Sequence, residues 1–135
     1  TKAKRRLFLE ALESRRVLAH IAYITGDNAP WLSETNNMAM DAVFGEGNWA
    51  AYQFRDAMEA GVLEPGSTRF MFIDGSDYEG VEMEEFISGN REALEDWVEA
   101  GGSLFLNAAR NYSFQPSINV GFGATLETGH FASTG

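Results

Sequence analysis

The stretch that most constrains this chain is residues 82–109, where a helical pattern, a pair of glycines and a short apolar segment follow one another. Apolar side chains recur there at spacings of three and four residues, which marks one face of an α-helix. These residues are Met83, Phe86, Ile87, Leu94, Trp97 and Val98, and Asn90 alone interrupts them. Gly101 and Gly102 follow, where glycine readily ends a helix. The pattern predicts one long amphipathic helix and then a buried strand at 103–106.

The rest of the chain adds further strand and helix patterns. Residues 17–25 and 69–74 are rich in β-branched and aromatic side chains, which predicts two more core strands. A short helix fits residues 34–44. Asn48 then suits the N-cap of a helix over 49–60. Nearer the C-terminus, residues 118–126 are expected to form a strand, a glycine turn and a second extended segment.

This order of strand, helix, strand, helix and strand is typical of the α/β class. Right-handed crossovers between such strands give a parallel sheet with helices on its faces. We therefore expect a three-layer, flavodoxin-like fold with a mostly parallel central sheet of about four or five strands.

Charge is divided unevenly along the 135 residues. Residues 1–16 hold six basic and two acidic residues, a net charge of +4, whereas residues 17–135 hold four arginines and 18 acids, a net charge of −14. A body that acidic repels phosphate, so nucleic acid is not an expected partner. The chain has no cysteine, which removes disulfides and cysteine nucleophiles. No apolar run is long enough to span a bilayer.

Loops after the carboxyl ends of parallel strands are where open sheets bind ligands. Asp27 and Asn28 follow the first predicted strand and are candidate ligand-binding residues. Asp74, Asp77 and Glu79 lie within six residues at the end of the next strand, and their oxygens suit a hard cation such as Ca²⁺. The spacing is not that of an EF-hand, and the same acids suit turn formation and the dipole of the following helix. We expect the helix-end role and no cofactor, with a Ca²⁺ site as the alternative.

Residues 5–18 carry a family motif. The segments 5–8 and 12–18 (RRLF and LESRRVL) resemble the LEPR-x-LL element near the N-termini of large extracellular or surface proteins of planctomycete-type bacteria. Ser14 and Val17 stand where that family usually has proline and leucine. The resemblance implies an N-terminal targeting or processing segment of a secreted protein. An amphipathic helix and a twin-arginine export signal are the other interpretations, although charged residues interrupt the apolar region that an export signal needs.

A second resemblance covers residues 69–110. This part of the chain has a strand ending in Asp74-Gly75, a long helix closing in WVEAGG and a short apolar strand. That order is similar to class I glutamine amidotransferase-like domains, including their ThuA-like relatives. In the amidotransferase enzymes a cysteine nucleophile follows that strand. The matching positions are Asn107 and the two alanines after it, and none of these side chains can attack a carbonyl. Asn107 and Arg110 are candidates to hydrogen-bond a ligand; alternatively, Asn107 satisfies backbone groups and Arg110 pairs with an acid.

The sequence therefore predicts residues 1–19 as a helical targeting or processing segment and 20–135 as an α/β amidotransferase-like domain. Because such domains are generally longer, we expect it to be incomplete at its C-terminus and to belong to a longer chain. The leading function is a non-catalytic binding or structural module of a bacterial secreted or surface protein, taking a small-molecule or carbohydrate ligand. The alternative is a ThuA-like hydrolase or sugar-active enzyme using Asp74 and Asp77, with or without a metal. An enzyme predicts convergent carboxylates in a deep pocket, whereas a module predicts solvated acids around a shallow crevice.

Overall fold

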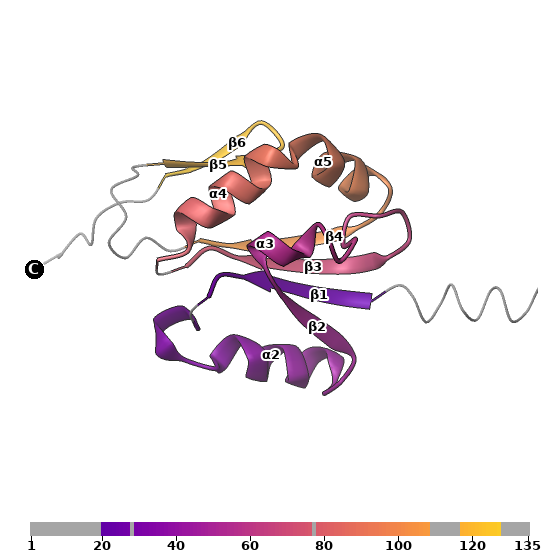
Figure 1. The fold of residues 1–135 in the computed structure, drawn as a ribbon, viewed down its shortest axis with the longest axis vertical. Helices are drawn as coiled ribbons and strands as arrows, with labels where there is room; N and C mark the ends of the chain where they lie inside the picture. The colour runs from indigo at the N-terminus through magenta and orange to yellow at the C-terminus, as the bar shows by residue number, and fades with distance from the viewer. Residues whose placement is uncertain (1–19, 28, 77, 109–116, 128–135) are drawn as a thin grey trace, which may run out of the picture.

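A computed structural model describes residues 20–27, 29–76, 78–108 and 117–127. They form an α/β domain around a four-stranded parallel sheet with strand order β2-β1-β3-β4 (Figure 1). The strands are β1 (His20–Thr25), β2 (Trp49–Gln53), β3 (Thr68–Asp74) and β4 (Ser103–Asn107). The expected three-layer, flavodoxin-like fold is confirmed. The N-terminal segment over residues 1–19 lies outside the described residues.

Helices cover both faces of the sheet. Helix α2 (Thr35–Phe44) lies on one face, whereas α3 (Phe54–Ala57), α4 (Gly80–Gly89) and α5 (Arg91–Glu99) lie on the other (Figure 1). A 3₁₀ turn, η1 (Pro30–Leu32), precedes α2. Successive strand residues point to opposite faces, so Ile21 and Tyr23 pack under α2 while Ala22 and Ile24 pack under the other three helices.

The predicted helix over residues 49–60 is wrong. Residues 49–53 form the edge strand β2, which pairs in parallel with β1, and only α3 remains helical. Pairing with β1 and packing on both faces outweigh the helical spacing of the small side chains here. Asn48 is not the N-cap of a following helix, because its side-chain amide donates to the carbonyl oxygen of Phe44 at 2.9 Å and so completes the end of α2.

The predicted long helix is divided at Asn90 into α4 and α5. The Asn90 side chain donates to the carbonyl oxygen of Phe86 at 2.8 Å, a local bond that competes with the helical ladder. The polar residue that interrupts the apolar face is thus the point where the helix breaks. The glycine pair does end α5 as predicted: Gly101 has a φ of +104°, and a Cβ on Gly102 would lie 2.4 Å from the ring of Trp97.

The C-terminal part of the described chain forms a separate hairpin. Strands β5 (Ser117–Gly121) and β6 (Ala124–Glu127) pair antiparallel and lie against α4, away from the main sheet (Figure 1). Ile118 and Val120 join the core on that side of the sheet. None of the helices in the described residues is long and apolar enough to cross a membrane.

Candidate functional site

The strand order places a switch point between β1 and β3. In the sheet, β2 lies on one side of β1 and β3 lies on the other. Helix α2, which follows β1, covers one face of the sheet, and helices α4 and α5, which follow β3, cover the other (Figure 1). The two connections therefore diverge at the carboxyl ends of β1 and β3. Open α/β sheets bind ligands at that point. Asp27, Asp74 and Asn107 all lie at this edge, as the sequence predicted, since each ends or follows a strand of the sheet.

Asp74 is the centre of a buried hydrogen-bond network. It has 0% exposure. Its Oδ2 accepts from the Tyr23 hydroxyl at 3.1 Å and from the Asn36 amide at 2.8 Å. Its Oδ1 accepts from the Ser76 backbone N–H at 3.1 Å, the Ser76 hydroxyl at 2.6 Å and the Asn107 amide at 3.3 Å.

These five bonds join elements that are far apart in the sequence. Tyr23 belongs to β1, Asn36 to α2, Ser76 to the loop after β3, and Asn107 to β4. A buried polar network of this kind makes the surrounding structure more rigid when its donors and acceptors are paired. We infer that Asp74 fixes the carboxyl ends of three strands relative to α2. The turn-forming role predicted for this acid is present in the Ser76 contacts.

Tyr23 remains protonated at physiological pH. Burial raises the pKa of its hydroxyl to about 12, and the Asp74 carboxylate adds to that rise, whereas the hydrogen bond from Asn36 opposes it. The protonated hydroxyl donates to Asp74 while it accepts from the Asn36 amide at 3.2 Å. Tyr23 is therefore a neutral donor within the network.

Glu79 is the second buried acid at this edge, with 4% exposure. Its carboxylate lies against Gly26, because a Cβ built there would come within 1.5 Å of Glu79 Oε2. Only glycine fits at that position without displacing the carboxylate. A binding module was expected to have solvated acids around a shallow crevice. Asp74 and Glu79 depart from that expectation, because both are buried.

The predicted cation site is described only in part, since Asp77 lies outside the described residues. Among the residues that the structure does describe, no three His, Cys, Asp or Glu side chains converge as a metal site would require. Both Asp74 oxygens already accept hydrogen bonds from the protein. The cation site therefore stays a prediction.

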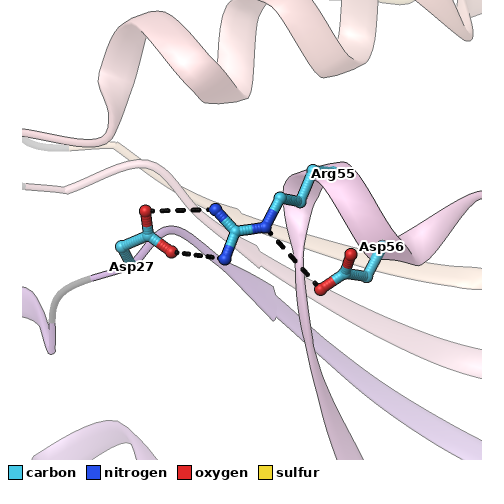
Figure 2. Close-up of polar contacts among 3 residues, drawn as sticks. All are labelled: Asp27, Arg55 and Asp56. Carbon is cyan, nitrogen blue, oxygen red and sulfur yellow. Dashed lines mark hydrogen bonds and ion pairs between the residues drawn. The ribbon is translucent and has the colours of Figure 1, made fainter.

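Asp27 lies at the rim and forms an ion pair. Figure 2 shows its carboxylate facing the Arg55 guanidinium in a two-point contact, with Nη2 3.1 Å from Oδ1 and Nη1 3.3 Å from Oδ2. Asp56 lies further away, its Oδ2 3.9 Å from Arg55 Nε. The pair bridges the loop after β1 and helix α3, which follows β2 directly. Its side chains are 66% and 54% exposed, so it contributes at most about 1 kcal/mol.

A hollow of about 280 Å³ lies beside Asp27 on the α2 side. We call it the crevice, and its polar lining consists of Tyr23, Thr25, Asp27, Ser33, Glu34, Asn36, Asn37, Tyr52 and Gln53. Amides and hydroxyls dominate this lining, and the two acids are exposed at its rim. A second hollow of about 420 Å³ shares Asp27 and Gln53 and is bounded by α3 and α4.

Several residues of the site were not predicted. Arg55 was missed because residues 49–60 were expected to be one helix, which hid the strand end that precedes it. Tyr23 and Asn36 were missed because the search for site residues favoured acidic side chains. The pair Asn36-Asn37, at the start of a helix that follows a strand, could have indicated a polar site at the strand end. Asn28, Asp77 and Arg110 lie outside the described residues.

Comparison of this chain with protein-family models, with curated proteins and with solved structures finds no match. The site is therefore assigned from its geometry alone. The geometry is that of a buried, hydrogen-bonded carboxylate next to a small polar crevice at the switch point of a parallel sheet.

Proposed function

We propose that this domain is a non-catalytic binding module that holds a small, neutral, hydroxyl-rich ligand of the carbohydrate class in the crevice. The observation that supports the proposal is the difference between buried Asp74 and the residues that line the crevice at the carboxyl ends of the strands. The buried acid is occupied by five internal hydrogen bonds, two of them from Tyr23 and Asn36 in the crevice wall, whereas Asn37, Gln53 and the exposed acids Asp27 and Glu34 line an open hollow.

The surroundings of Asn107 and Asp74 support binding over catalysis. Asn107 lies where the amidotransferase resemblance would place a nucleophile, and its amide donates to Asp74 at 3.3 Å. Asp74 has no exposed surface. It would have to leave its donors before it reached a substrate, and buried donors without partners are costly. The hydrolase or sugar-active alternative uses this carboxylate together with that of Asp77, which lies outside the described residues.

The lining of the crevice supports a hydroxyl-rich ligand. Amide side chains both donate and accept hydrogen bonds, as sugar hydroxyls do. Asp27 and Glu34 at the rim accept from hydroxyls and repel anions. The volume of about 280 Å³ is close to the lower limit of small-molecule sites, about 300 Å³. These features together favour a compact neutral ligand.

We propose further that the module belongs to a bacterial secreted or surface protein and works with other domains of a longer chain. This part rests on the LEPR-x-LL-like motif in residues 5–18, which lie outside the described residues. A carbohydrate-binding role is compatible with that setting, because extracellular bacterial proteins meet polysaccharides directly.

Saturation-transfer NMR with a panel of neutral monosaccharides and short oligosaccharides tests the proposal. We expect transfer to at least one sugar, and its loss in Gln53→Ala, because Gln53 ends β2 in the crevice wall. Thr125→Ala is the control, since Thr125 is an exposed polar residue of β6 and lies outside the crevice lining. That variant should bind as the unaltered chain does.

A panel of nitrophenyl glycosides provides the opposing test. Release of nitrophenol at a rate that falls in Asp74→Asn but not in Thr125→Ala would contradict a non-catalytic role. Absence of transfer to every neutral sugar at millimolar concentration would contradict the carbohydrate class.

A further inference from the structure

The second hollow beside Asp27 has a different lining from the crevice. It has a volume of about 420 Å³ and lies between α3 and α4, on the face of the sheet opposite α2 (Figure 1). We call it the α3–α4 hollow. Its volume falls within the range of small-molecule sites, which begins at about 300 Å³. Carbohydrate binding in the crevice leaves this hollow without a role.

Apolar side chains form the floor of the α3–α4 hollow. The rings of Phe54 on α3 and Phe86 on α4 line it, with their centroids 5.6 Å apart. Both phenylalanines are almost buried, so they give the floor a fixed shape. Met58, which directly follows α3, adds a soft, polarisable thioether and is 41% exposed. Aromatic rings attract cations through their quadrupoles, so this floor suits the apolar part of an organic cation.

Carboxylates lie around the rim of the hollow. Glu82 and Glu85 are three residues apart on α4 and both are exposed, so they project from the same side of the helix. Asp27 is the third acid of the described lining, and Arg55 is its one base. Arg55 is already engaged by Asp27 in the two-point ion pair of Figure 2. One base and three acids give the described lining a net charge of −2.

The geometry favours an organic cation over a metal ion or an anion. Ca²⁺ needs about six to eight oxygen ligands in direct coordination. No three His, Cys, Asp or Glu side chains of the described chain converge in that way, so the rim acids surround the hollow without meeting at one point. An anion would be repelled by the net charge of the lining. A diffuse positive charge on an apolar body fits both the floor and the rim.

We propose that the α3–α4 hollow binds a small organic ammonium compound, with its apolar part on the two phenylalanine rings and its charge toward the carboxylates of α4. This inference does not rest on carbohydrate binding, because the described linings of the two hollows share only Asp27 and Gln53. Exposed ion pairs and cation–π contacts each contribute little binding energy. We therefore expect a dissociation constant of about 1 mM.

A titration of the isotope-labelled 135-residue chain with choline, followed by amide NMR, tests the proposal. The neutral analogue in which carbon replaces the ammonium nitrogen has the same shape and hydroxyl, so the comparison isolates the charge. We expect choline to shift the side-chain amide signals of Asn90 and Gln53, which line the hollow. The analogue should bind at least about fivefold more weakly. Higher salt should weaken choline binding, because it screens the attraction of the rim.

The double substitution Glu82→Gln/Glu85→Gln removes the two rim charges on α4 and should raise the dissociation constant of choline by about fivefold. The matched control is Glu84→Gln/Glu99→Gln, which removes the same charge from α4 and α5 at residues outside the lining of the hollow. The control should change the constant by less than about twofold. Glutamine and glutamate have similar helix propensities, so both variants should fold, and their amide spectra report this directly.

Equal binding of choline and its neutral analogue would overturn the proposal, since the ammonium charge would then have no role. Equal loss of affinity in the two double variants would also overturn it, because choline would then be held only by general attraction to an acidic surface. Shifts confined to the amides of Asn36 and Asn37 would place choline in the crevice instead. Absence of any shift at about 50 mM choline would show that the hollow does not bind this class of ligand.

Discussion

Asp27 and Asp74 lie at the same edge of the sheet, and their surroundings differ in almost every respect. Asp27 is about half exposed and meets one partner, Arg55, in an exposed ion pair. Asp74 is fully buried and accepts five hydrogen bonds from four residues on different elements. Two aspartates that look equivalent as candidate ligands in the sequence thus have different physical roles. Burial and the number of donors decide which of them maintains the fold.

The largest effect is expected from removal of the buried carboxylate. Asp74→Ala leaves the donors of Tyr23, Asn36 and Asn107 without their acceptor in a buried site. Breaking a buried charged network typically costs about 3–5 kcal/mol. Urea unfolding followed by circular dichroism measures the loss. A loss below about 1 kcal/mol would show that Asp74 is no more structural than a surface residue.

The next effect concerns Tyr23 and pH. Its folded pKa of about 12 lies above the ordinary value of 10, so its stabilising contribution is complete below pH 10 and is lost as pH rises through 12. The shift corresponds to about 2–3 kcal/mol. Unfolding free energies between pH 9 and about 12.5 should fall more steeply for the unaltered chain than for Tyr23→Phe. Parallel curves would contradict the assigned surroundings of this hydroxyl.

A smaller effect is expected from Asn107→Ala. It removes one of the five hydrogen bonds to Asp74, at 3.3 Å the longest of them. A single hydrogen bond to a charged group contributes about 1.5–3 kcal/mol, and this long bond should lie near the lower value. Thermal unfolding reports the change. A variant as unstable as Asp74→Ala would mean that Asn107 has a further structural role.

The smallest effect is expected from the rim pair. Asp27→Ala and Arg55→Ala should each change the unfolding free energy by less than about 1 kcal/mol, because both side chains are mainly exposed. A double-mutant cycle should give a coupling of about 0.2–1 kcal/mol that decreases with salt. A coupling above about 2 kcal/mol would remove the contrast between the two aspartates.

The fold could be predicted from the sequence more completely than the candidate site. Apolar spacing in residues 82–100 predicted the helical region and its apolar face, and the glycine pair predicted its end. Spacing alone missed β2, because an edge strand with small side chains resembles a helix until its pairing with β1 is known. The helix break at Asn90 was visible only as an interruption of the pattern.

The site depended on contacts between residues distant in the sequence. Asp74 was a candidate because it ends a strand, and that placement is correct. Its donor Asn36 is 38 residues away and its donor Asn107 is 33 residues away. No local pattern connects these amides to the carboxylate, since the sheet order brings them together. The sequence therefore predicted that the site lies at the carboxyl ends of the strands, but it did not predict the hydrogen-bond network around Asp74.

The most direct test of Asp74 as a structural centre is the melting temperature of the chain in Ca²⁺ and in EDTA, together with Asp74→Asn. If Asp74 is fully engaged by the protein, the unaltered chain should melt at the same temperature in both solutions, and Asp74→Asn should lower that temperature equally in both. A ligand present at a hundredfold excess over its dissociation constant stabilises the folded state by about 2.7 kcal/mol. A Ca²⁺-dependent rise of that size, absent in Asp74→Asn, would contradict the structural role and identify this carboxylate as a metal ligand.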